Sequence, residues 1–291
     1  MDLKDKVVVI TGSAGGIGKV MALAMAQEGG KIVVADRRDQ PFAALPGTIN
    51  ETVEEIEKAG GQALPVRLDL RREEEIVALR DQVLERFGTV DIVVNNAGIQ
   101  FLAPVWETPA ERWDQVMSVN ARGTFLMCKH FLPTMIAKNS GNILNISSRA
   151  GRGRLGPPLM RSVYGVSKAA IDYFTLGLAQ EVKEYNIAVN ALAPSVAVDT
   201  PGNRLVITDE SWWKGWEPAE HYVKAAVWLV KQDVSYTGNL VMSREIILEK
   251  NLCDSWCCQT LIPSDAGTLL PGVEAVESSC KGRRPEEGSR G

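Results

Sequence analysis

A glycine-rich turn between an apolar strand and a helix is the feature that most narrows the possible folds of this chain. Residues 7–10 are Val-Val-Val-Ile, a β-branched run typical of a strand that is buried on both faces. Gly12, Gly16 and Gly18 follow directly, and apolar side chains then recur with helical spacing over residues 20–27. Glycine at these positions lets the backbone turn tightly and approach a phosphate at the N-terminus of the helix. The pattern predicts the first strand–turn–helix unit of a nucleotide-binding α/β fold.

Strand and helix patterns continue to alternate along the chain. Further strands are expected at residues 32–35, 63–68, 90–94, 142–146, 187–192 and 240–242, and helices at 48–59, 72–87, 162–185 and 219–230. Because the two patterns alternate, we predict a single α/β domain: a doubly wound, parallel, seven-stranded sheet of the Rossmann type with helices on both faces. This domain should occupy residues 1–252. Residues 253–291 contain scattered Gly, Pro and Ser without periodicity, so we expect a poorly ordered C-terminal tail there.

The composition excludes several classes of function. The net charge of −4 provides no basic surface for nucleic acid, and no apolar run reaches the ~20 residues that would span a bilayer. The N-terminal residues are too charged for a signal peptide, so we expect a cytoplasmic protein. Five cysteines with only two histidines do not give the spacing of a structural zinc site. We therefore expect reduced thiols and no bound metal.

The end of the second predicted strand bears on the choice of cofactor. Asp36 lies there, where a carboxylate can accept both ribose hydroxyls of NAD and would repel the 2′-phosphate of NADP. Arg37 and Arg38 follow immediately, and either guanidinium could instead pair with that phosphate. The acidic residue occupies the strand end itself, so we expect NAD, with NADP as the alternative.

A tyrosine and a lysine, well downstream of the glycine-rich turn, indicate the chemistry. Tyr164 has a phenol whose ordinary pKa near ~10 makes it a poor acid or base at neutral pH. Lys168 follows four residues later, so on a helix the two side chains project from the same face. The ammonium can stabilise the phenolate and bring the pKa of the hydroxyl towards the working range. The pair predicts proton transfer beside a bound redox cofactor.

Taken in order, these motifs resemble the classical short-chain dehydrogenase/reductase family over residues 3–252. The segments at 40–49 and 237–248 resemble its hydroxysteroid dehydrogenase-like branch. The resemblance implies a catalytic tetrad of Asn120, Ser148, Tyr164 and Lys168. It also implies a homo-dimer or homo-tetramer, and a cofactor site made by Gly12, Ser13, Gly16, Ile17, Gly18, Asp36, Arg37, Asp69, Leu70, Asn96, Ala97, Gly98, Tyr164, Lys168, Pro194 and Val196.

The same resemblance implies hydride exchange between nicotinamide and a secondary alcohol or ketone. Tyr164 would then donate or accept the proton, Lys168 would bind the nicotinamide ribose, Ser148 would orient the substrate oxygen and Asn120 would hold a water. Trp212, Trp213 and Trp216 cluster where this family has its variable lid. They favour an apolar or acyl substrate, although such a cluster can equally be a packing or subunit contact.

Three features depart from the family pattern. The 16 residues from Ser148 to Tyr164 exceed the usual family spacing, and the extra residues fall in the segment 152–161, which could reshape the pocket without moving the tetrad. Ser195 follows Pro194 where the family has glycine, and residues 253–291 have no counterpart in the family. Ser195 and this tail leave an alternative function open, a catalytically silent nucleotide-binding scaffold or regulator on the same fold.

Overall fold

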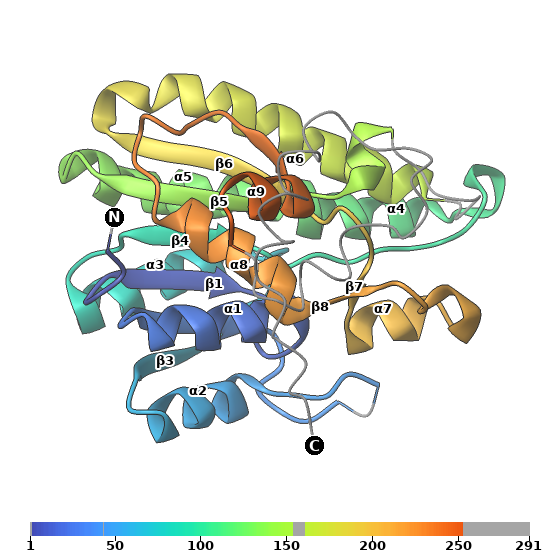
Figure 1. Cartoon of the computed structure of the whole chain (residues 1–291), viewed down its shortest axis with the longest axis horizontal. Helices are drawn as coiled ribbons and strands as arrows, with labels where there is room; N and C mark the ends of the chain where they lie inside the picture. The colour runs from blue at the N-terminus through green and yellow to red at the C-terminus, as the bar shows by residue number, and fades with distance from the viewer. Residues whose placement is uncertain (1, 43, 154–160, 253–291) are drawn as a thin grey trace, which may run out of the picture.

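A parallel sheet of seven strands forms the centre of the molecule, with the order β3-β2-β1-β4-β5-β6-β9 (Figure 1). The computed structural model describes residues 2–42, 44–153 and 161–252. Every neighbouring pair in the sheet is parallel, which confirms the predicted Rossmann-type α/β fold. The strands are β1 (Val7–Thr11), β2 (Lys31–Asp36), β3 (Gln62–Arg67), β4 (Ile92–Asn95), β5 (Gly141–Ile146), β6 (Ile187–Ala193) and β9 (Leu240–Met242).

Helices cover both faces of the sheet. One face packs against α1 (Gly16–Gln27), α2 (Ile49–Lys58), α8 (Ala219–Val230) and α9 (Ser243–Glu249). The other packs against α3 (Glu73–Phe87), α5 (Gly123–Ala137) and α6 (Ser162–Glu181).

The central strand β1 contributes to both of these cores. Val8 and Ile10 point into the first, and Val7 and Val9 into the second. Successive side chains of a strand alternate between faces, so a strand buried on both sides must be apolar throughout. This is why the β1 sequence shows no polar alternation.

The ends of the elements differ slightly from the predicted ones, for local reasons. Thr48 is the N-cap of α2 and forms a capping box with Glu51, so the helix itself begins one residue later than expected. The long helix predicted for residues 162–185 stops at Glu181, and a separate 3-10 turn, Lys183–Tyr185, follows it. The predicted strand 90–94 is shifted to Ile92–Asn95, because the ladder with β1 starts at the pair Val8–Ile92.

Several elements around the carboxyl ends of the strands had no predicted bounds. A helical stretch runs through α4 (Ala110–Met117), a π-helical turn (Ser118–Arg122) and α5. After β6 come β7 (Val198–Asp199), α7 (Pro201–Val206) and β8 (Glu217–Pro218), with β7 and β8 forming a small parallel pair. The order of the main sheet reverses between β1 and β4, which in such folds marks the edge where ligands bind.

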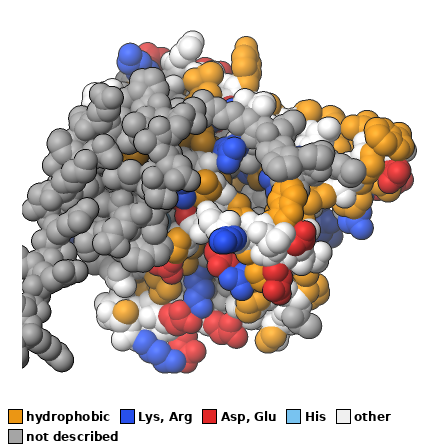
Figure 2. All heavy atoms as spheres, turned by 45° about the vertical axis from the view of Figure 1, so that its right-hand side comes forward, with side chains coloured by type: hydrophobic (Ala, Val, Ile, Leu, Met, Phe, Trp, Pro, Cys, Tyr) orange, Lys and Arg blue, Asp and Glu red, His pale blue; other side chains and the backbone are white. Residues whose placement is uncertain are grey.

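Acidic and basic side chains are intermingled on the described part of the face shown in Figure 2. Within residues 2–42, 44–153 and 161–252, no helix combines the length and apolar composition needed to cross a bilayer. The tail predicted for residues 253–291 lies outside the described residues, as does most of the segment 152–161, in which extra residues were expected.

Candidate active site

The glycine-rich turn is clamped between β1 and the end of β4. Gly12 has φ +70°, and a Cβ there would lie 2.8 Å from the Cα of Ala97. A Cβ on Gly18 would lie only 2.2 Å from the carbonyl oxygen of Gly12, so neither position can carry a side chain. Asn96 donates from Nδ2 to the carbonyl oxygens of Thr11 at 2.8 Å and Gly12 at 3.2 Å. The tight turn that the sequence predicted is therefore present, and the hydrogen bonds from Asn96 stabilise it.

Two residues expected to contact the cofactor turn their side chains into the protein. Ser13 is fully buried: its Oγ donates to the Ile10 carbonyl at 2.7 Å and accepts from the Ala35 amide at 3.1 Å. Leu70 is a member of the core beneath α3 and α5, and it fills the space beside Gly123. These side chains shape the site by packing. Ile17, in α1, likewise packs against the core on its own side of the sheet.

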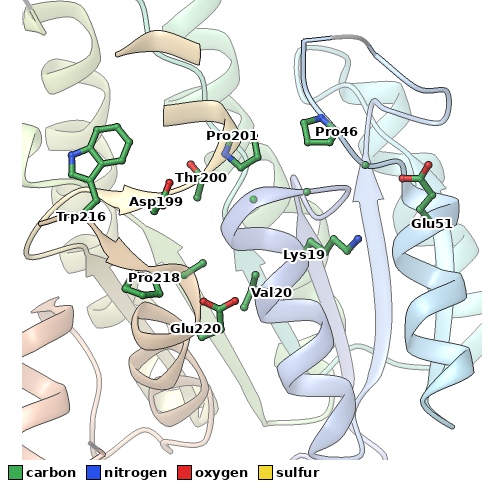
Figure 3. A pocket seen from close by; sticks show the side chains of 14 residues that line it. Lys19, Val20, Pro46, Glu51, Asp199, Thr200, Pro201, Trp216, Pro218 and Glu220 are labelled. Carbon is green, nitrogen blue, oxygen red and sulfur yellow. The ribbon is translucent and has the colours of Figure 1, made fainter. Parts of the chain in front are cut away.

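A cavity of about 500 Å³ opens beside the glycine-rich turn (Figure 3). It lies between the N-terminal end of α1 and the segment from β7 to α8. Thr200 contributes one wall and also caps α7 by accepting from the Asn203 amide at 3.2 Å. Neither Ser148 nor Tyr164 lines it. The lining consists of Gly15, Gly16, Lys19, Val20, Pro46, Gly47, Glu51, Asp199, Thr200, Pro201, Trp216, Pro218, Ala219 and Glu220.

Asp36, at the end of β2, is already paired. Its Oδ2 lies 3.2 Å from Nη2 of Arg38, and its Oδ1 accepts from the Arg38 amide at 3.1 Å. Arg38 also donates to the carbonyl of Pro46 at 3.1 Å, which holds the guanidinium beside the glycine-rich turn. Arg37 is exposed. Of Arg37 and Arg38, the two arginines predicted as possible partners of a 2′-phosphate, it is therefore Arg38 that contacts the Asp36 carboxylate, which is predicted to bind ribose.

Asp69 lies just beyond β3, and the family resemblance places it in the cofactor site. Arg71 donates from Nε to its Oδ1 at 2.9 Å. This hydrogen bond lowers the pKa of Asp69 to about 2, against an opposing effect of burial. The carboxylate is consequently ionised at neutral pH and shared with Arg71.

Tyr164 and Ser148 come together from α6 and from the end of β5. Burial raises the pKa of the Tyr164 hydroxyl, while a hydrogen bond with Ser148 and the charge of Arg161 lower it. The pKa of Tyr164 is therefore raised overall, whereas the sequence predicted that it would be lowered. The loss of water around the phenol outweighs the favourable charges. The Ser148 side chain also accepts from the Ala150 amide at 3.3 Å, at the start of the 3-10 turn Arg149–Arg152.

Lys168 is buried one helical turn after Tyr164. Its Nζ donates to the carbonyl of Ile146 at 2.7 Å and lies 5.7 Å from the centroid of the Tyr164 ring. Burial lowers the pKa of Lys168 to about 8, and the charge of Asp172 opposes that shift. Gly98 lies close to this ammonium, since a Cβ built there would be 3.4 Å from Nζ.

Asn120 lies in the π-helical turn and is completely buried. Its Oδ1 accepts from the Ile99 amide and its Nδ2 donates to the Ile99 carbonyl, both at 2.9 Å. Nδ2 also donates to Oγ of Ser167 at 2.9 Å, and that hydroxyl donates to the Tyr164 carbonyl at 2.7 Å. Hydrogen bonds thus connect Asn120, through Ser167, to the backbone of α6 at Tyr164. A π-turn at this point fits a functional site, where such turns are frequent.

Ser195, the residue that departs from the family pattern, has a definite structural role. Its amide donates to Oγ of Ser243 at 3.0 Å, and its own Oγ accepts from the Arg244 amide at 3.0 Å. Arg149 donates to its carbonyl at 2.9 Å. Ser195 does not have a positive φ, so the backbone here does not require glycine. The neighbouring Pro194 and Val196, predicted to contact the cofactor, are half-buried.

The tryptophan cluster is packed rather than open. Trp213 donates from its indole nitrogen to the Ile207 carbonyl at 2.8 Å, and the guanidinium of Arg204 lies 4.7 Å from its ring centroid. Trp216 lies 6.2 Å from Trp213, centroid to centroid, and lines the cavity beside the glycine-rich turn. These contacts support the packing interpretation for Trp213 and place Trp216 at the cavity.

Among the described residues, no three His, Cys, Asp or Glu side chains are grouped to hold a metal ion. Cys128 is a free, buried thiol whose pKa burial raises to about 12, so it is unreactive at neutral pH. The other four cysteines, at 253, 257, 258 and 280, lie outside the described residues.

Sequence reasoning did not single out Thr200, Ser167, Arg149 or Arg161. Thr200 did carry a signal, since a threonine followed by proline is typical of a helix N-cap. The other three act through contacts between segments far apart in the chain, for which the sequence offered no local pattern.

The fold and this arrangement of side chains define a Rossmann-type protein with a Ser–Tyr–Lys set at the edge where dinucleotides bind. A family model described as short chain dehydrogenase matches residues 6–211. The chain belongs to the short-chain dehydrogenase family, and its similarity to curated relatives places it in the hydroxysteroid dehydrogenase-like branch.

Named relatives and solved structures agree with this assignment. Hydroxysteroid dehydrogenase-like protein 2 of Homo sapiens is 36% identical over 247 residues, which cover 84% of this chain and 58% of that protein. The chain therefore spans less than two thirds of the length of such relatives. A short chain dehydrogenase from Mycobacterium thermoresistibile has a TM-score of 0.77 at 32% identity, covering 85% of this chain and 88% of the other. A candidate NAD(P)-dependent gluconate 5-dehydrogenase from Beutenbergia cavernae, with NADP bound at low occupancy, has a TM-score of 0.74 at 28% identity, covering 83% and 96%.

Proposed function

We propose that this chain is an NAD(P)-dependent oxidoreductase that transfers hydride between nicotinamide and a secondary alcohol or ketone. The observation that carries the proposal is the meeting of Tyr164 with Ser148, with the Lys168 ammonium held one turn along the same helix. Such a set can position a substrate oxygen and exchange a proton with it. Membership of the short-chain dehydrogenase family supports the same reaction.

The glycine-rich turn and the cavity beside it suit a dinucleotide. Gly12 and Gly18 leave no room for a side chain, so the main chain itself can meet a pyrophosphate at the N-terminus of α1. Asp36 supports a preference for NAD, because its carboxylate would repel a 2′-phosphate. Arg38 shields part of that charge and keeps NADP as the alternative.

The bound nicotinamide would supply or accept the hydride, and the residues of this chain would handle the proton. In reduction, the Tyr164 hydroxyl gives its proton to the oxygen of the substrate, and in oxidation the phenolate takes one. Ser148 orients that oxygen by hydrogen bonding. The charge of Lys168 stabilises the phenolate that remains after proton donation. Asn120 holds the segment around Ile99 against α6, since it bonds to the Ile99 backbone and, through Ser167, to the Tyr164 carbonyl.

For the substrate, we propose an apolar or acyl alcohol or ketone. Support comes from hydrophobic side chains exposed on the segment after β4, where Val105 is 62% and Trp106 85% exposed. The proposal includes a cytoplasmic homo-dimer or homo-tetramer.

The test is direct titration of the full chain with NAD and NADP, followed by turnover across a panel of alcohols and ketones. Cofactor binding together with turnover of a secondary alcohol supports the enzyme. Tight cofactor binding with no turnover on the whole panel would instead favour the silent scaffold.

A further inference from the structure

Within the described part of the chain, two arginines beside the predicted reacting residues have no carboxylate partner, whereas comparable arginines do. Six arginines of the described chain are half-buried, at positions 38, 80, 149, 152, 161 and 244. Four of them pair with a carboxylate: Arg38–Asp36 at 3.2 Å, Arg80–Asp81 at 2.6 Å, Arg152–Asp172 at 3.0 Å and Arg244–Glu217 at 3.5 Å. Arg149 and Arg161 make no ion pair with any described residue.

Both unpaired arginines adjoin the candidate reaction centre. Arg149 directly follows Ser148, and its Nη1 donates to the Ser195 carbonyl, which leaves donors of the guanidinium unused. Arg161 is the N-cap residue of α6, one turn before Tyr164. Its Nε is buried and has no hydrogen-bond partner. Burial lowers the pKa of Arg161, and the charge of Tyr164 opposes that shift. The charge of Arg149 adds to the lowering, so the two cations are close enough to repel each other.

A half-buried guanidinium with a buried, unpartnered Nε, as in Arg161, is unfavourable unless something compensates it. The carboxylate of Asp172 is already held by Arg152, and no other described carboxylate pairs with Arg149 or Arg161. The described residues thus leave positive charge uncompensated next to Ser148 and Tyr164. Arginine pairs well with carboxylate and phosphate because its planar fork donates two parallel hydrogen bonds.

We propose that Arg149 and Arg161 form an anion subsite, which binds a carboxylate or phosphate on the substrate whose hydroxyl or carbonyl meets Tyr164 and Ser148. This inference rests on the proposed function and narrows its substrate class to an alcohol or ketone with an apolar chain and an anionic group. The anion would neutralise both guanidinium groups in the bound state, because the described residues supply no carboxylate for either of them.

The test uses pairs of substrates that share the reacting alcohol and the alkyl chain but differ in the presence of an anionic group. The first pair is 3-hydroxyhexanoate and its methyl ester, and the second is 2-hydroxyhexyl phosphate and 2-hexanol, which separates carboxylate from phosphate. We expect wild-type protein to prefer the charged member of at least one pair in kcat/KM. In Arg161→Gln and Arg149→Gln that preference should fall about tenfold or more, as for loss of a charge-assisted hydrogen bond. Arg161→Lys should restore part of it, and Arg86→Gln, at an exposed arginine of α3, is the control.

Binding of hexanoate and of hexyl phosphate, which carry the charge but no reacting alcohol, is measured by calorimetry in the same proteins. Weaker binding of either anion in both glutamine variants, but not in Arg86→Gln, supports the subsite even if no alcohol is turned over, in which case only the proposed function fails. Equal binding by wild type and variants, or no binding of either anion by wild type, overturns the subsite. So does equal use of the charged and neutral members of both pairs. Thermal melting of each variant confirms that it is folded.

Discussion

The ammonium of Lys168 lies 5.7 Å from the centroid of the Tyr164 ring while it donates to the carbonyl of Ile146 at 2.7 Å. The hydrogen bond fixes the lysine to the end of β5, and the helix fixes the tyrosine one turn earlier. A phenolate on Tyr164 therefore has a cation beside it without any large movement of the lysine. This arrangement leads directly to predictions for the two residues.

Removal of the Tyr164 hydroxyl should abolish turnover but leave the affinity for the cofactor unchanged. In Tyr164→Phe the ring remains, but no proton can be exchanged with the substrate oxygen. We expect kcat/KM for a secondary alcohol to fall by about 10²–10⁴-fold, the usual contribution of a positioned acid or base. Steady-state kinetics and cofactor titration measure the two effects. Tyr173→Phe, at an 80% exposed tyrosine of the same helix, is the control. Undiminished turnover in Tyr164→Phe would exclude the tyrosine as the proton donor.

The buried Lys168 should make stability depend on alkaline pH. Its pKa is about 8 in the folded protein, below its ordinary value of 10.5, so the unfolded chain holds the proton more tightly. Unfolding therefore takes up a proton between pH 8 and 10.5, and the free energy of unfolding rises with pH across that window. Below pH 8 the buried charge of Lys168 lowers the free energy of unfolding by its full amount, on the order of 3 kcal/mol. Above pH 10.5 this destabilisation is absent.

Lys168→Met isolates this effect from other groups that titrate at high pH. We expect the free energy of unfolding of wild type, relative to the variant, to increase as the pH rises from 8 to 10.5. Urea denaturation at a series of pH values measures the difference. A difference that stays constant, or that decreases with pH, would show that the lysine is not destabilised by burial.

The fold could be predicted from the sequence because its signals are local. A buried β-branched run such as Val7 to Ile10, followed by glycines that only a tight turn needs, specifies a strand, its environment and the next helix. The helix α5 gave no such signal. It is apolar on most sides, contains Pro133 and has no side-chain cap, so neither amphipathic spacing nor its ends could be read.

In the candidate site, only contacts that follow from the spacing of residues within one helix could be predicted from the sequence. Tyr164 and Lys168 share a helix face, and their proximity follows from helical geometry alone. The link between Ser195 and Ser243 joins segments 48 residues apart and depends on how β6 and β9 end. The pKa of Tyr164 was predicted with the wrong sign, because spacing reveals a neighbouring charge but not how much water the fold removes.

The pairing of Asp36 with Arg38 predicts how cofactor preference will change. Asp36→Ala removes the carboxylate that would repel a 2′-phosphate and releases the Arg38 guanidinium, which can then pair with that phosphate. We expect the ratio of NADP to NAD affinity to rise about tenfold or more, as for gain of one charge-assisted contact. Fluorescence titration with both cofactors measures it, and Asp39→Ala, at a neighbouring carboxylate that is 45% exposed, is the control. Tighter binding of NADP than NAD by the wild-type protein would contradict the assignment of Asp36.

Ser195 should stabilise the protein through the first turn of α9. Its Oγ accepts from the Arg244 amide at 3.0 Å, a group that has no partner within the helix, and α9 receives no side-chain cap from its own N-cap residue, Met242. Ser195→Ala should therefore lower the free energy of unfolding by about 0.5–2 kcal/mol, as for loss of a helix cap. The Ser211 hydroxyl bonds only within an exposed turn. The control Ser211→Ala should therefore change the free energy of unfolding by less than about 0.5 kcal/mol.

Ser195→Gly separates the hydroxyl from the backbone as the source of this stabilisation. Glycine is the residue that the family pattern has here, but the backbone does not have a positive φ, so glycine gains nothing conformationally and adds freedom to the unfolded chain. We therefore expect Ser195→Gly to be at least as unstable as Ser195→Ala in urea denaturation. If the glycine variant matched wild type while the alanine variant did not, the serine would be acting through local backbone geometry, and the proposed cap on α9 would be wrong.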